Sequence, residues 1–354
     1  MRVLVVNAGS SSLKLRLLDE HDEVIESADL PPDGDVGSVL QGWPRPDVAG
    51  HRIVHGGVEF SSATRLDERV RRRLDELTDL APLHQPKSLA ALDAVSAALP
   101  GVPAVACFDT AFHRTIPAEA ATYAVPAEWR ERYGVRRYGF HGLSHAYASR
   151  RAVELTGAGS RVVTCHLGAG ASLCAVLDGR SVDTTMGFTP LEGLVMATRS
   201  GSIDPGLVLW LEEHEQLTPH EVAVALEKQS GLLALAGTAD LREVEVRASD
   251  GDPDARLATD VYVHRLVGSI ASMVATLGGL DVLVFTGGVG EHSAAIRAAT
   301  AQRLAWLGLG IDAAANEAVD GDAVISADAT SVGTVVVAAR EDLQIAHEVR
   351  DLLG

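Results

Sequence analysis

The stretch VLVVNAGSSSLKLRLLD, residues 3–19, reads as two apolar segments joined by a turn of small residues. Residues 3–6 and 13–18 have the pattern of buried strands, and Gly9 permits a tight turn between them. Serines in such a turn expose backbone N–H groups and hydroxyls to an anion, and Lys14 adds a positive charge at its edge. An isolated turn of this kind is more often a plain β-hairpin, so this stretch alone does not establish an anion site.

A second stretch repeats the same order of elements. Residues 161–178, RVVTCHLGAGASLCAVLD, align without gaps on residues 2–19 and match at both ends and at the central glycine. Both stretches read as strand, Gly/Ser turn, strand and aspartate. This echo predicts two related halves, whose turns together could clasp a polyphosphate.

The composition is that of a globular protein. The chain has 354 residues, of which 47% are hydrophobic and 22% charged, and this length favours two domains. Apolar strands interleave with residues 88–99 and 261–277, whose apolar positions have helical spacing, so we expect an α/β fold. Residues 20–50 are polar and contain several prolines, and we expect them to form surface connections.

The net charge of −18 argues against nucleic acid as a partner, because no basic field exists to attract phosphates. The sequence contains no apolar run of the roughly 18 residues that a membrane-spanning helix needs. The three cysteines form neither a disulfide framework nor a metal-binding spacing, and Cys165 and Cys174 read as core residues. Because the sequence starts with a strand and lacks a signal-peptide layout, we expect a soluble protein in the reducing cytoplasm.

Two arginines lie in loops of small residues. Arg52 belongs to HRIVHGG and Arg199 to MATRSGSIDPG. Such arginines are usually solvated surface charges, but a pair of guanidinium groups also suits a carboxylate and a transferring phosphoryl group. Asp109 ends an apolar strand, where α/β sites collect, although it could instead cap a helix. His141, in a glycine-flanked loop, is a candidate donor with packing as the alternative.

A third glycine-rich turn is expected within DVLVFTGGVGEHS, residues 281–293. Glycines at 287, 288 and 290 would let the backbone approach a flat ligand such as adenine. The spacing fits neither the GxGxxG fingerprint nor a Walker loop, so neither of those folds is implied.

The order of these segments resembles the acetate kinase family, within the superfamily of acetate and sugar kinases, heat-shock ATPases and actin. The matching segments extend from residue 4 to about 346, and DTTMGFTPLEGL followed by TRSG is the most specific of them. They are NAGSSSLK, HRIVHGG, LAPLHQP, FDTAFH, RRYGFHGLSH, HLGAGAS, DTTMGFTPLEGLVMATRSGSIDPG, SGLLALAG, VFTGGVGEHS and EDLQIA.

The resemblance implies two duplicated domains of the actin-like ATPase, ribonuclease H-like type, with an ATP cleft between them. Residues 1–145 would form the acyl-substrate domain, with a helix at about 342–354 packing back on it. Residues 146–341 would form the nucleotide-binding domain, through which a homodimer would assemble. The implied ligands are acetate, ATP or ADP, and Mg²⁺ or Mn²⁺.

The resemblance also implies a role for each matched position. Catalysis would use Arg52, Asp109, His141 and Arg199. The substrate pocket would consist of Arg52, Val54, Leu83, Phe140 and Pro190. The phosphates of ATP would meet Lys14, His166, Leu167, Gly168, Ala169 and Gly170. The adenosine would lie against Asp240, Leu241, Arg242, Gly288, Val289, Gly290, Glu291 and His292. The metal ion would be held by Asn7 and Glu341.

The implied reaction is the reversible, direct in-line transfer of the γ-phosphoryl group of ATP to acetate. A carboxylate is already ionised at pH 7, so positioning and fixed positive charge would carry the catalysis. A propionate or butyrate kinase differs only in pocket volume and stays open as an alternative. A catalytically weakened nucleotide-binding regulator and a sugar or polyol kinase are further alternatives; the last would need a polar pocket.

The chain departs from the family pattern at several positions. Ala169 stands where the family has Asn, and this puts the strength of nucleotide binding in doubt. Ser202 replaces Asp, Ala197 replaces Gly, and Gln85 replaces Asn. Glu341 is flanked by Arg340 and Asp342 in place of the usual Asn-Glu-Glu, so its assignment depends on the alignment. The chain is also shorter than typical members, mostly within residues 20–50.

Overall fold

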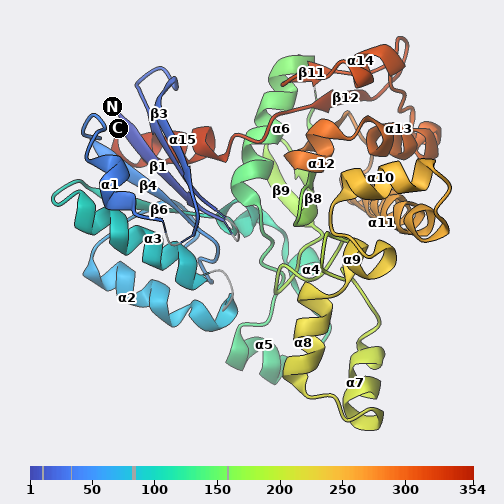
Figure 1. The fold of residues 1–354 in the computed structure, drawn as a ribbon, viewed down its shortest axis with the longest axis horizontal. Helices are drawn as coiled ribbons and strands as arrows, with labels where there is room; N and C mark the ends of the chain where they lie inside the picture. Colours follow the sequence, from blue (N-terminus) through green and yellow to red (C-terminus); the bar gives the residue numbers. More distant parts are fainter. Residues whose placement is uncertain (10–11, 33, 82–84, 158) are drawn as a thin grey trace. The chain divides into compact units, whose positions relative to one another are not determined.

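The computed structural model describes residues 1–9, 12–32, 34–81, 85–157 and 159–354. These residues form two compact units (Figure 1). The first unit comprises Met1–Arg114, Phe140–Tyr147 and Arg340–Gly354, and the second comprises Thr115–Gly139 and Ala148–Ala339. Residues 115–139 therefore differ from the expected division, which placed them in the first domain. They belong to the second unit because Tyr138 and Gly139 donate backbone hydrogen bonds to the carbonyl of Gly187.

The first unit is built on a sheet of six strands with the order β3-β2-β1-β4-β6-β5. β1 runs parallel to β4, and β4 to β6, whereas the remaining pairs are antiparallel. The strands are β1 (Val3–Ala8), β2 (Leu13–Leu18), β3 (Val24–Leu30), β4 (Val48–Ile53), β5 (Thr64–Arg65) and β6 (Ala104–Phe108). The predicted strands at 3–6 and 13–18 are thus confirmed.

Residues 20–50 are not only surface connections, as we expected, because they contain β3 and the short helix α1 (Val36–Leu40). β3 lies at the edge of the sheet and pairs only with β2 among the described strands. Most of its residues are exposed or half-buried, Val24 and Ile25 among the exposed ones. An edge strand of this kind needs few apolar residues, so its sequence does not stand out from a loop.

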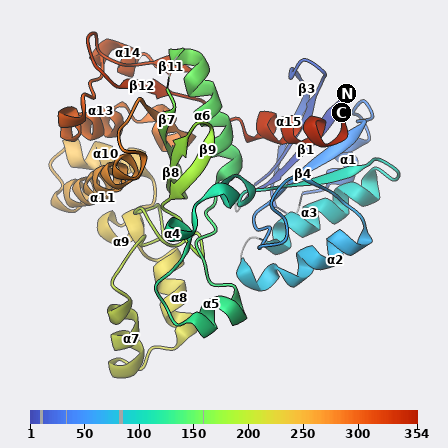
Figure 2. The same cartoon turned by 180° about the vertical axis from the view of Figure 1, so that it is seen from behind.

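Helices cover both faces of this sheet (Figures 1 and 2). α1 and α3 (Gln85–Ala98) pack on one face, and α2 (Glu68–Glu76) lies against α3. α15 (Glu341–Leu353) packs on the other face, against β1, β4 and β6. A Cβ atom on Gly50 of β4 would lie 2.7 Å from Cγ2 of Ile345. The glycine thus lets α15 approach β4 closely, which brings the first turn of α15 to Arg52.

The second unit repeats the first strand by strand. Its sheet has the order β11-β12-β10-β7-β8-β9, in which β7 to β12 occupy the places of β1, β2, β3, β4, β5 and β6. The strands are β7 (Arg161–Leu167), β8 (Ala171–Leu177), β9 (Arg180–Thr184), β10 (Val282–Thr286), β11 (Ala323–Val324) and β12 (Gly333–Val336). The parallel and antiparallel pairings also correspond. The internal echo between residues 2–19 and 161–178 is therefore a true structural duplication.

α6 (Gly142–Thr156) belongs to both units, because residues 142–147 lie in the first and the rest of the helix, from Ala148, lies in the second. The helix expected at 261–277 is the end of α11 (Pro253–Leu277), which begins earlier because Asp252 caps it. The other helices of the second unit are α4 (Ala118–Ala121), α5 (Ala127–Tyr133), α7 (Pro205–His214), α8 (Pro219–Lys228), α9 (Gly231–Ala236), α10 (Leu241–Ser249), α12 (Gly287–His292), α13 (Ala294–Arg303) and α14 (Ala313–Glu317).

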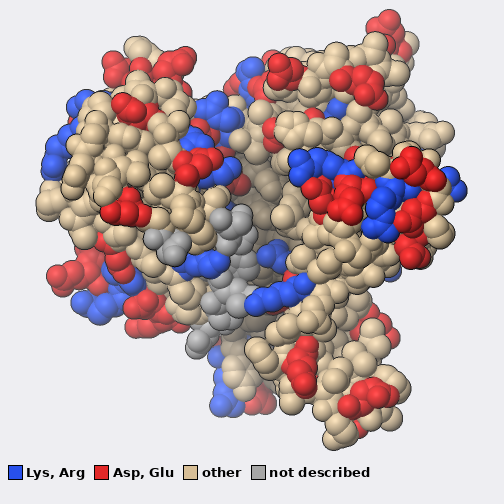
Figure 3. Space-filling view, viewed as in Figure 1, with Lys and Arg blue, Asp and Glu red and all other residues tan. Residues whose placement is uncertain are grey.

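The three cysteines are buried and free, which confirms Cys165 and Cys174 as core residues. In the part of the chain that the structure describes, no helix is both long and apolar enough to cross a membrane. Acidic and basic side chains are interspersed on the face drawn in Figure 3.

Candidate functional site

A charged cluster in the first unit joins four residues that are far apart in the sequence. Nε and Nη2 of Arg52 donate to the two carboxylate oxygens of Asp109, at 3.0 and 2.6 Å. Nη1 of Arg52 donates to Oδ1 of Asn7 at 3.1 Å. Nδ2 of Asn7 donates to Oε2 of Glu341 at 2.7 Å, and that oxygen lies 3.8 Å from Nε of Arg52. The structure thus brings Asn7, Arg52, Asp109 and Glu341 together.

The Arg52–Asp109 ion pair is buried. Asp109 is 1% exposed, and its burial raises the pKa of its carboxyl group, while the charge of Arg52 opposes the rise. Burial alone would lower the pKa of the Arg52 guanidinium, but the carboxylates of Asp109 and Glu341 raise it above its ordinary value. Arg52 therefore stays charged, and the two-point contact with Asp109 fixes the plane of its guanidinium.

The loop that carries His141 is held against Asp109 by its backbone. The N–H of Gly142 donates to the carbonyl oxygen of Asp109 at 2.8 Å. His141 itself has a left-handed φ of 57°. A Cβ atom on Gly142 would lie 2.2 Å from the Asp109 oxygen, so only glycine fits this approach. Asp109 and His141, two predicted catalytic residues, are therefore neighbours through the backbone.

Two of the apolar residues predicted to contact the acyl chain, Val54 and Phe140, are buried in the first unit. Phe140 is 1% exposed, its carbonyl contacts Nε2 of His113 at 3.0 Å, and its ring meets the His55 ring edge-on. Burial lowers the pKa of His55 to about 4, so its ring is neutral at pH 7. Val54 is also buried. Leu83, the other apolar position expected here, lies outside the described residues.

Lys14 is an exposed residue of β2 directly opposite Asn7 in the β1–β2 pairing. Its side chain therefore projects from the same face of the sheet as Asn7, which is the face that α15 covers.

In the second unit, the β7–β8 turn lies beside the segment after β10. Residue His166 pairs with Thr286 in register, and a Cβ atom on Gly287 would lie 2.8 Å from the Leu167 oxygen. The N–H of Gly168 closes the turn onto the Gly170 oxygen at 3.0 Å. The predicted phosphate residues, His166 to Gly170, and the predicted adenosine residues, Gly288 to His292, are thus adjacent.

The segment after β10 is not the glycine turn that we expected but the short helix α12. Gly287 enters this helix with a left-handed φ of 77°. A Cβ atom on Gly290 would lie 3.3 Å from the carbonyl carbon of Phe285. Glycine at 287 and 290 is therefore explained by close packing of α12 on the strands rather than by a turn.

A buried arginine that the sequence reasoning missed stabilises the end of α12. Nη1 of Arg297 donates to the carbonyl oxygens of Gly290 and Glu291 at 2.9 and 2.8 Å. Nε and Nη2 donate to Asn316, to Oδ1 and to the backbone oxygen, both at 2.7 Å. The sequence does show an arginine directly after Ile296, at a buried position of α13 where an apolar residue is usual.

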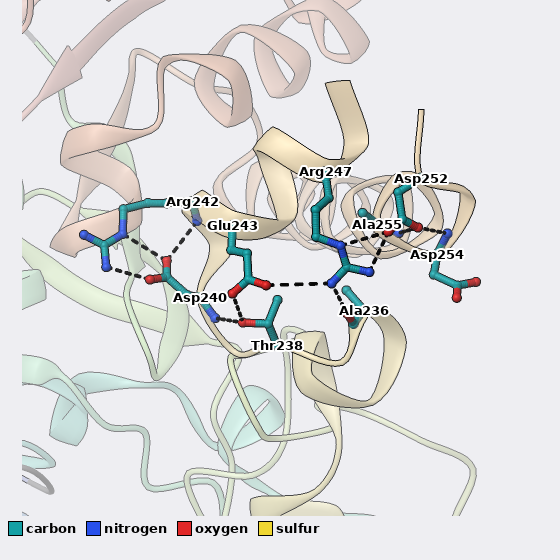
Figure 4. A network of polar contacts seen from close by, with 9 residues as sticks. All are labelled: Ala236, Thr238, Asp240, Arg242, Glu243, Arg247, Asp252, Asp254 and Ala255. Atoms are coloured by element: carbon teal, nitrogen blue, oxygen red, sulfur yellow. Dashed lines mark hydrogen bonds and ion pairs between the residues drawn. The ribbon is translucent and has the colours of Figure 1, made fainter. Parts of the chain in front are cut away.

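Asp240, Leu241 and Arg242 lie at the start of α10 (Figure 4). Asp240 caps the helix by accepting from the Arg242 N–H, and its Oδ2 also pairs with Nη2 of Arg242 at 2.6 Å. Leu241 is buried. Glu245, one turn further on, accepts a short hydrogen bond from Ser293. That contact links α10 to the residue that follows α12.

Arg199 and Pro190 are brought together in the second unit. Nη1 of Arg199 donates to the carbonyl oxygen of Pro190 at 3.3 Å. Burial lowers the pKa of the Arg199 guanidinium, and the charge of Glu227 opposes this. A Cβ atom on Gly231, which has a left-handed φ of 66°, would lie 2.8 Å from the Arg199 oxygen. Tight backbone packing therefore holds the Arg199 loop.

Three of the departures from the family pattern, at Ser202, Gln85 and Ala169, are accommodated by contacts in the structure. Oγ of Ser202 accepts from the N–H of Gly193 at 3.0 Å, as an aspartate oxygen could. The amide of Gln85 bonds to both backbone groups of His55. Ala169 has an exposed side chain, and its carbonyl accepts from the N–H of Ala197 at 3.2 Å. The turn therefore keeps its shape without the family's amide side chain.

Arg340 pairs with Asp342, through Nε and Nη2, both at 2.9 Å from its carboxylate. Glu341 is the residue of this trio that contacts Asn7. Among the described residues, no three His, Cys, Asp or Glu side chains form a metal-binding group. Asn7 and Glu341 offer two hard oxygen donors, which fits Mg²⁺, because that ion keeps several waters and phosphate oxygens as ligands.

The strand order shared by the two sheets defines a duplicated α/β protein of the actin-like ATPase class. A family model described as the acetokinase family matches residues 45–347, and the chain belongs to this family. The chain is 41% identical to the acetate kinase of Fervidobacterium nodosum over 398 aligned residues, which cover 100% of this chain and 98% of that protein.

Solved structures agree with this assignment. Porphyromonas gingivalis acetate kinase superposes with a TM-score of 0.91 at 35% identity, over 100% of both chains. A propionate kinase from Francisella tularensis subsp. tularensis superposes with a TM-score of 0.89, also at 35% identity, over 98% of both chains.

Proposed function

We propose that this protein is an ATP-dependent phosphotransferase with a carboxyl acceptor, an acetate kinase that forms acetyl phosphate and ADP reversibly. Its family and its relatives named acetate kinase support this proposal. The observation that carries it is the buried two-point pair of Arg52 and Asp109, with Asn7 and Glu341 in contact. This cluster combines an oriented carboxylate receptor with oxygen donors for a metal ion.

Arg52 is proposed to bind the carboxylate of acetate. A guanidinium carries five N–H groups, and the contacts to Asp109 and Asn7 use one on each nitrogen of Arg52. Two N–H groups therefore remain to meet the acetate oxygens, and Asp109 fixes their direction. The acetate oxygen attacks the γ-phosphorus, the bond from phosphorus to the bridging β,γ-oxygen breaks, and ADP leaves. No base is needed, because acetate is already ionised at pH 7.

The main obstacle is the approach of one anion to another. We propose that His141 and Arg199 neutralise charge on the transferring phosphoryl group, while Lys14 and residues 166–170 hold the ATP phosphates. Asn7 and Glu341 would hold Mg²⁺ or Mn²⁺, which when bound neutralises phosphate charge. The adenosine would lie against α12 and the start of α10, at residues 288–292 and 240–242.

A propionate kinase is a second candidate, because a protein of that name superposes on this chain at the same sequence identity as the acetate kinase. Val54, Leu83, Phe140 and Pro190 are each proposed to contact the acyl chain. One methylene changes binding in an apolar pocket by only about 1–3 kcal/mol. The kcat/KM values for acids of one to four carbons decide between the candidates, and a preference for propionate would replace acetate in the proposal.

Trapping of the acyl phosphate tests the activity directly. The protein is incubated with Mg-ATP, acetate and hydroxylamine, and the hydroxamate is measured beside Arg52→Ala, Asp109→Ala and Arg199→Ala. We expect product from the wild type and a large loss in each variant. If the wild type yields no more than Arg199→Ala, a weakened nucleotide-binding regulator replaces the enzyme. A polyol kinase is disfavoured because Val54 and Phe140 are buried and apolar.

We also propose a homodimer that assembles through the second unit. No residue of α7 is buried, although the helix carries large apolar side chains. Leu207, Leu209 and Trp210 are each more than two-fifths exposed. Exposed apolar side chains gathered on one helix mark an association surface. Sedimentation of the wild type and of Leu209→Glu tests this, with a dimer expected only for the wild type. A monomeric wild type would contradict the proposal.

A further inference from the structure

The segment DTTMGFTPLEGL contributes only Pro190 to the proposed site, although it is the most specific segment of the sequence. In the structure, Glu192 of this segment meets two side chains from outside it, Tyr123 and Arg137. Oε1 of Glu192 accepts from Nη2 of Arg137 at 2.8 Å, and Oε2 accepts a short hydrogen bond from the Tyr123 hydroxyl. The guanidinium carbon of Arg137 lies 5.5 Å from the centre of the Tyr123 ring. We call these three residues the Tyr-Arg-Glu triad.

The triad holds backbone groups of consecutive residues. Nη1 of Arg137 donates to the carbonyl oxygens of Thr184, Thr185 and Met186, at 3.1, 3.2 and 3.2 Å. The Tyr123 hydroxyl accepts from the N–H of Phe188 at 3.0 Å. The carbonyl of the residue between them, 187, accepts from residues 138 and 139. Every residue from 184 to 188 is therefore tied to the triad or to the chain that follows Arg137.

The loop is shaped around the triad. A Cβ atom on Gly187 would lie 1.8 Å from Oε2 of Glu192 and 2.0 Å from the Tyr123 hydroxyl oxygen. A residue other than glycine fits at position 187 only if the Glu192 carboxylate and the Tyr123 hydroxyl move apart. Burial raises the pKa of Tyr123, and the hydrogen bond to Glu192 adds to this, so the phenol remains a donor at pH 7.

The same loop carries groups of the proposed active site. Two residues after Phe188, the carbonyl of Pro190 accepts from Nη1 of Arg199. Beyond Glu192, Gly193 pairs with Ser202 through its carbonyl at 2.9 Å and its N–H at 3.0 Å. The loop is thus fixed at both ends, by the triad and by Ser202, with Pro190 and the Arg199 contact between them.

We propose that Tyr123, Arg137 and Glu192 are positioning residues that set the place of Pro190 and of the Arg199 guanidinium. The triad acts on Pro190 and Arg199 through the backbone of residues 184–193. The proposal rests on the proposed function, because Pro190 and Arg199 matter to acyl transfer only in such an enzyme. It assigns the triad to the acyl acceptor and to the phosphoryl group rather than to binding of adenosine.

Two isosteric variants test the proposal. Glu192→Gln keeps the size of the side chain but offers one acceptor oxygen where the triad uses two. Tyr123→Phe removes the hydroxyl that serves Glu192 and Phe188. Because charge-assisted hydrogen bonds are lost, we expect kcat/KM for acetate to fall about ten- to a hundredfold in each variant. KM for ATP should stay within about twofold, and the ratio of kcat/KM for propionate to that for acetate should change at least about threefold.

A double variant and a matched control separate positioning from general destabilisation. Because both changes break one network, Tyr123→Phe combined with Glu192→Gln should cost little more than the worse single variant. Arg137→Lys is compared with Arg161→Lys, since Arg161, at the start of β7, also forms a close ion pair, with Asp281 at 2.5 Å against 2.8 Å for Arg137 and Glu192. We expect the acetate effect only for Arg137→Lys, with similar melting temperatures.

The outcomes are distinguishable from failure of the proposed function. A wild type without hydroxamate product refutes the function and with it the role of the triad. An active wild type whose triad variants match Arg161→Lys in kcat/KM for acetate refutes the triad alone. Equal increases in KM for ATP and for acetate would also overturn the proposal, because they would show a general loss of structure.

Discussion

The contact between Gly142 and Asp109 gives a prediction whose size follows from the structure. In Gly142→Ala, the new Cβ atom would lie 2.2 Å from the Asp109 carbonyl oxygen and 2.9 Å from Cβ of Phe112. Ordinary contact begins at 3.4 Å, so the two chain segments must separate by 3.4 − 2.2 = 1.2 Å. The hydrogen bond from the Gly142 N–H would lengthen, and His141 would move with it. A misplacement of about 1 Å costs roughly a hundredfold in rate.

We therefore expect kcat in the hydroxamate assay to fall about a hundredfold in Gly142→Ala, by that geometric estimate. The matched control is Gly42→Ala in the same unit, because a Cβ atom there meets no heavy atom within 4 Å. Circular dichroism and thermal unfolding establish that both variants are folded. If Gly142→Ala keeps a kcat within about threefold of the control, the Asp109–His141 spacing does not govern the reaction.

Three further predictions follow from single contacts. A lysine cannot serve the four acceptors of Arg297 at once. In Arg297→Lys, KM for ATP should therefore rise about tenfold while KM for acetate stays unchanged. A KM for ATP equal to that of the wild type would contradict the role of Arg297. In the hydroxamate assay, Arg340→Ala should keep the wild-type dependence on Mg²⁺, because Arg340 pairs with Asp342 rather than with the metal ligands. Glu341→Ala should weaken that dependence. Similar losses in the two variants would argue against Glu341 as the metal ligand. Burial raises the pKa of Glu348 to about 7, so the unfolded chain loses this proton first and stability falls as pH rises from about 4.5 to 7. Urea unfolding gives the free energy of unfolding at each pH. The advantage of Glu348→Gln over the wild type should grow by up to about 3 kcal/mol between pH 5 and pH 8. A difference that does not change with pH would contradict the raised pKa of Glu348.

The sequence predicts the parts of the fold that local patterns determine. The β1–β2 hairpin and its repeat in β7–β8 follow from alternating apolar residues around glycine turns. The second half of α11, residues 261–277, follows from its apolar stripe, whereas its start at the Asp252 cap was not predicted. β3 escaped prediction because a half-exposed edge strand lacks that pattern. α12 escaped because its glycines serve close packing on β10 and on β7, and β7 lies more than a hundred residues earlier.

The candidate site divides in a similar way. The residues themselves left Arg52 open between a surface charge and a ligand, and only the resemblance to a family joined it to Asn7, Asp109 and Glu341. The structure places these four side chains in contact. Arg297 and the Tyr-Arg-Glu triad were not predicted, because their partners are backbone groups and distant side chains that only tertiary folding brings near. No local pattern of residues records such contacts.

The position of α15 has a consequence for the order in which a nascent chain can mature on the ribosome. Residues 115–339 supply the whole second unit, so that unit can complete its core while the final residues are still being synthesised. The first sheet must wait for α15, since Ile345 and Val349 cover Val3 and Val5 on one of its faces. Until Glu341 emerges, Arg52 also lacks one of its two acidic neighbours. Strand β1 is thus translated long before the helix that completes its packing.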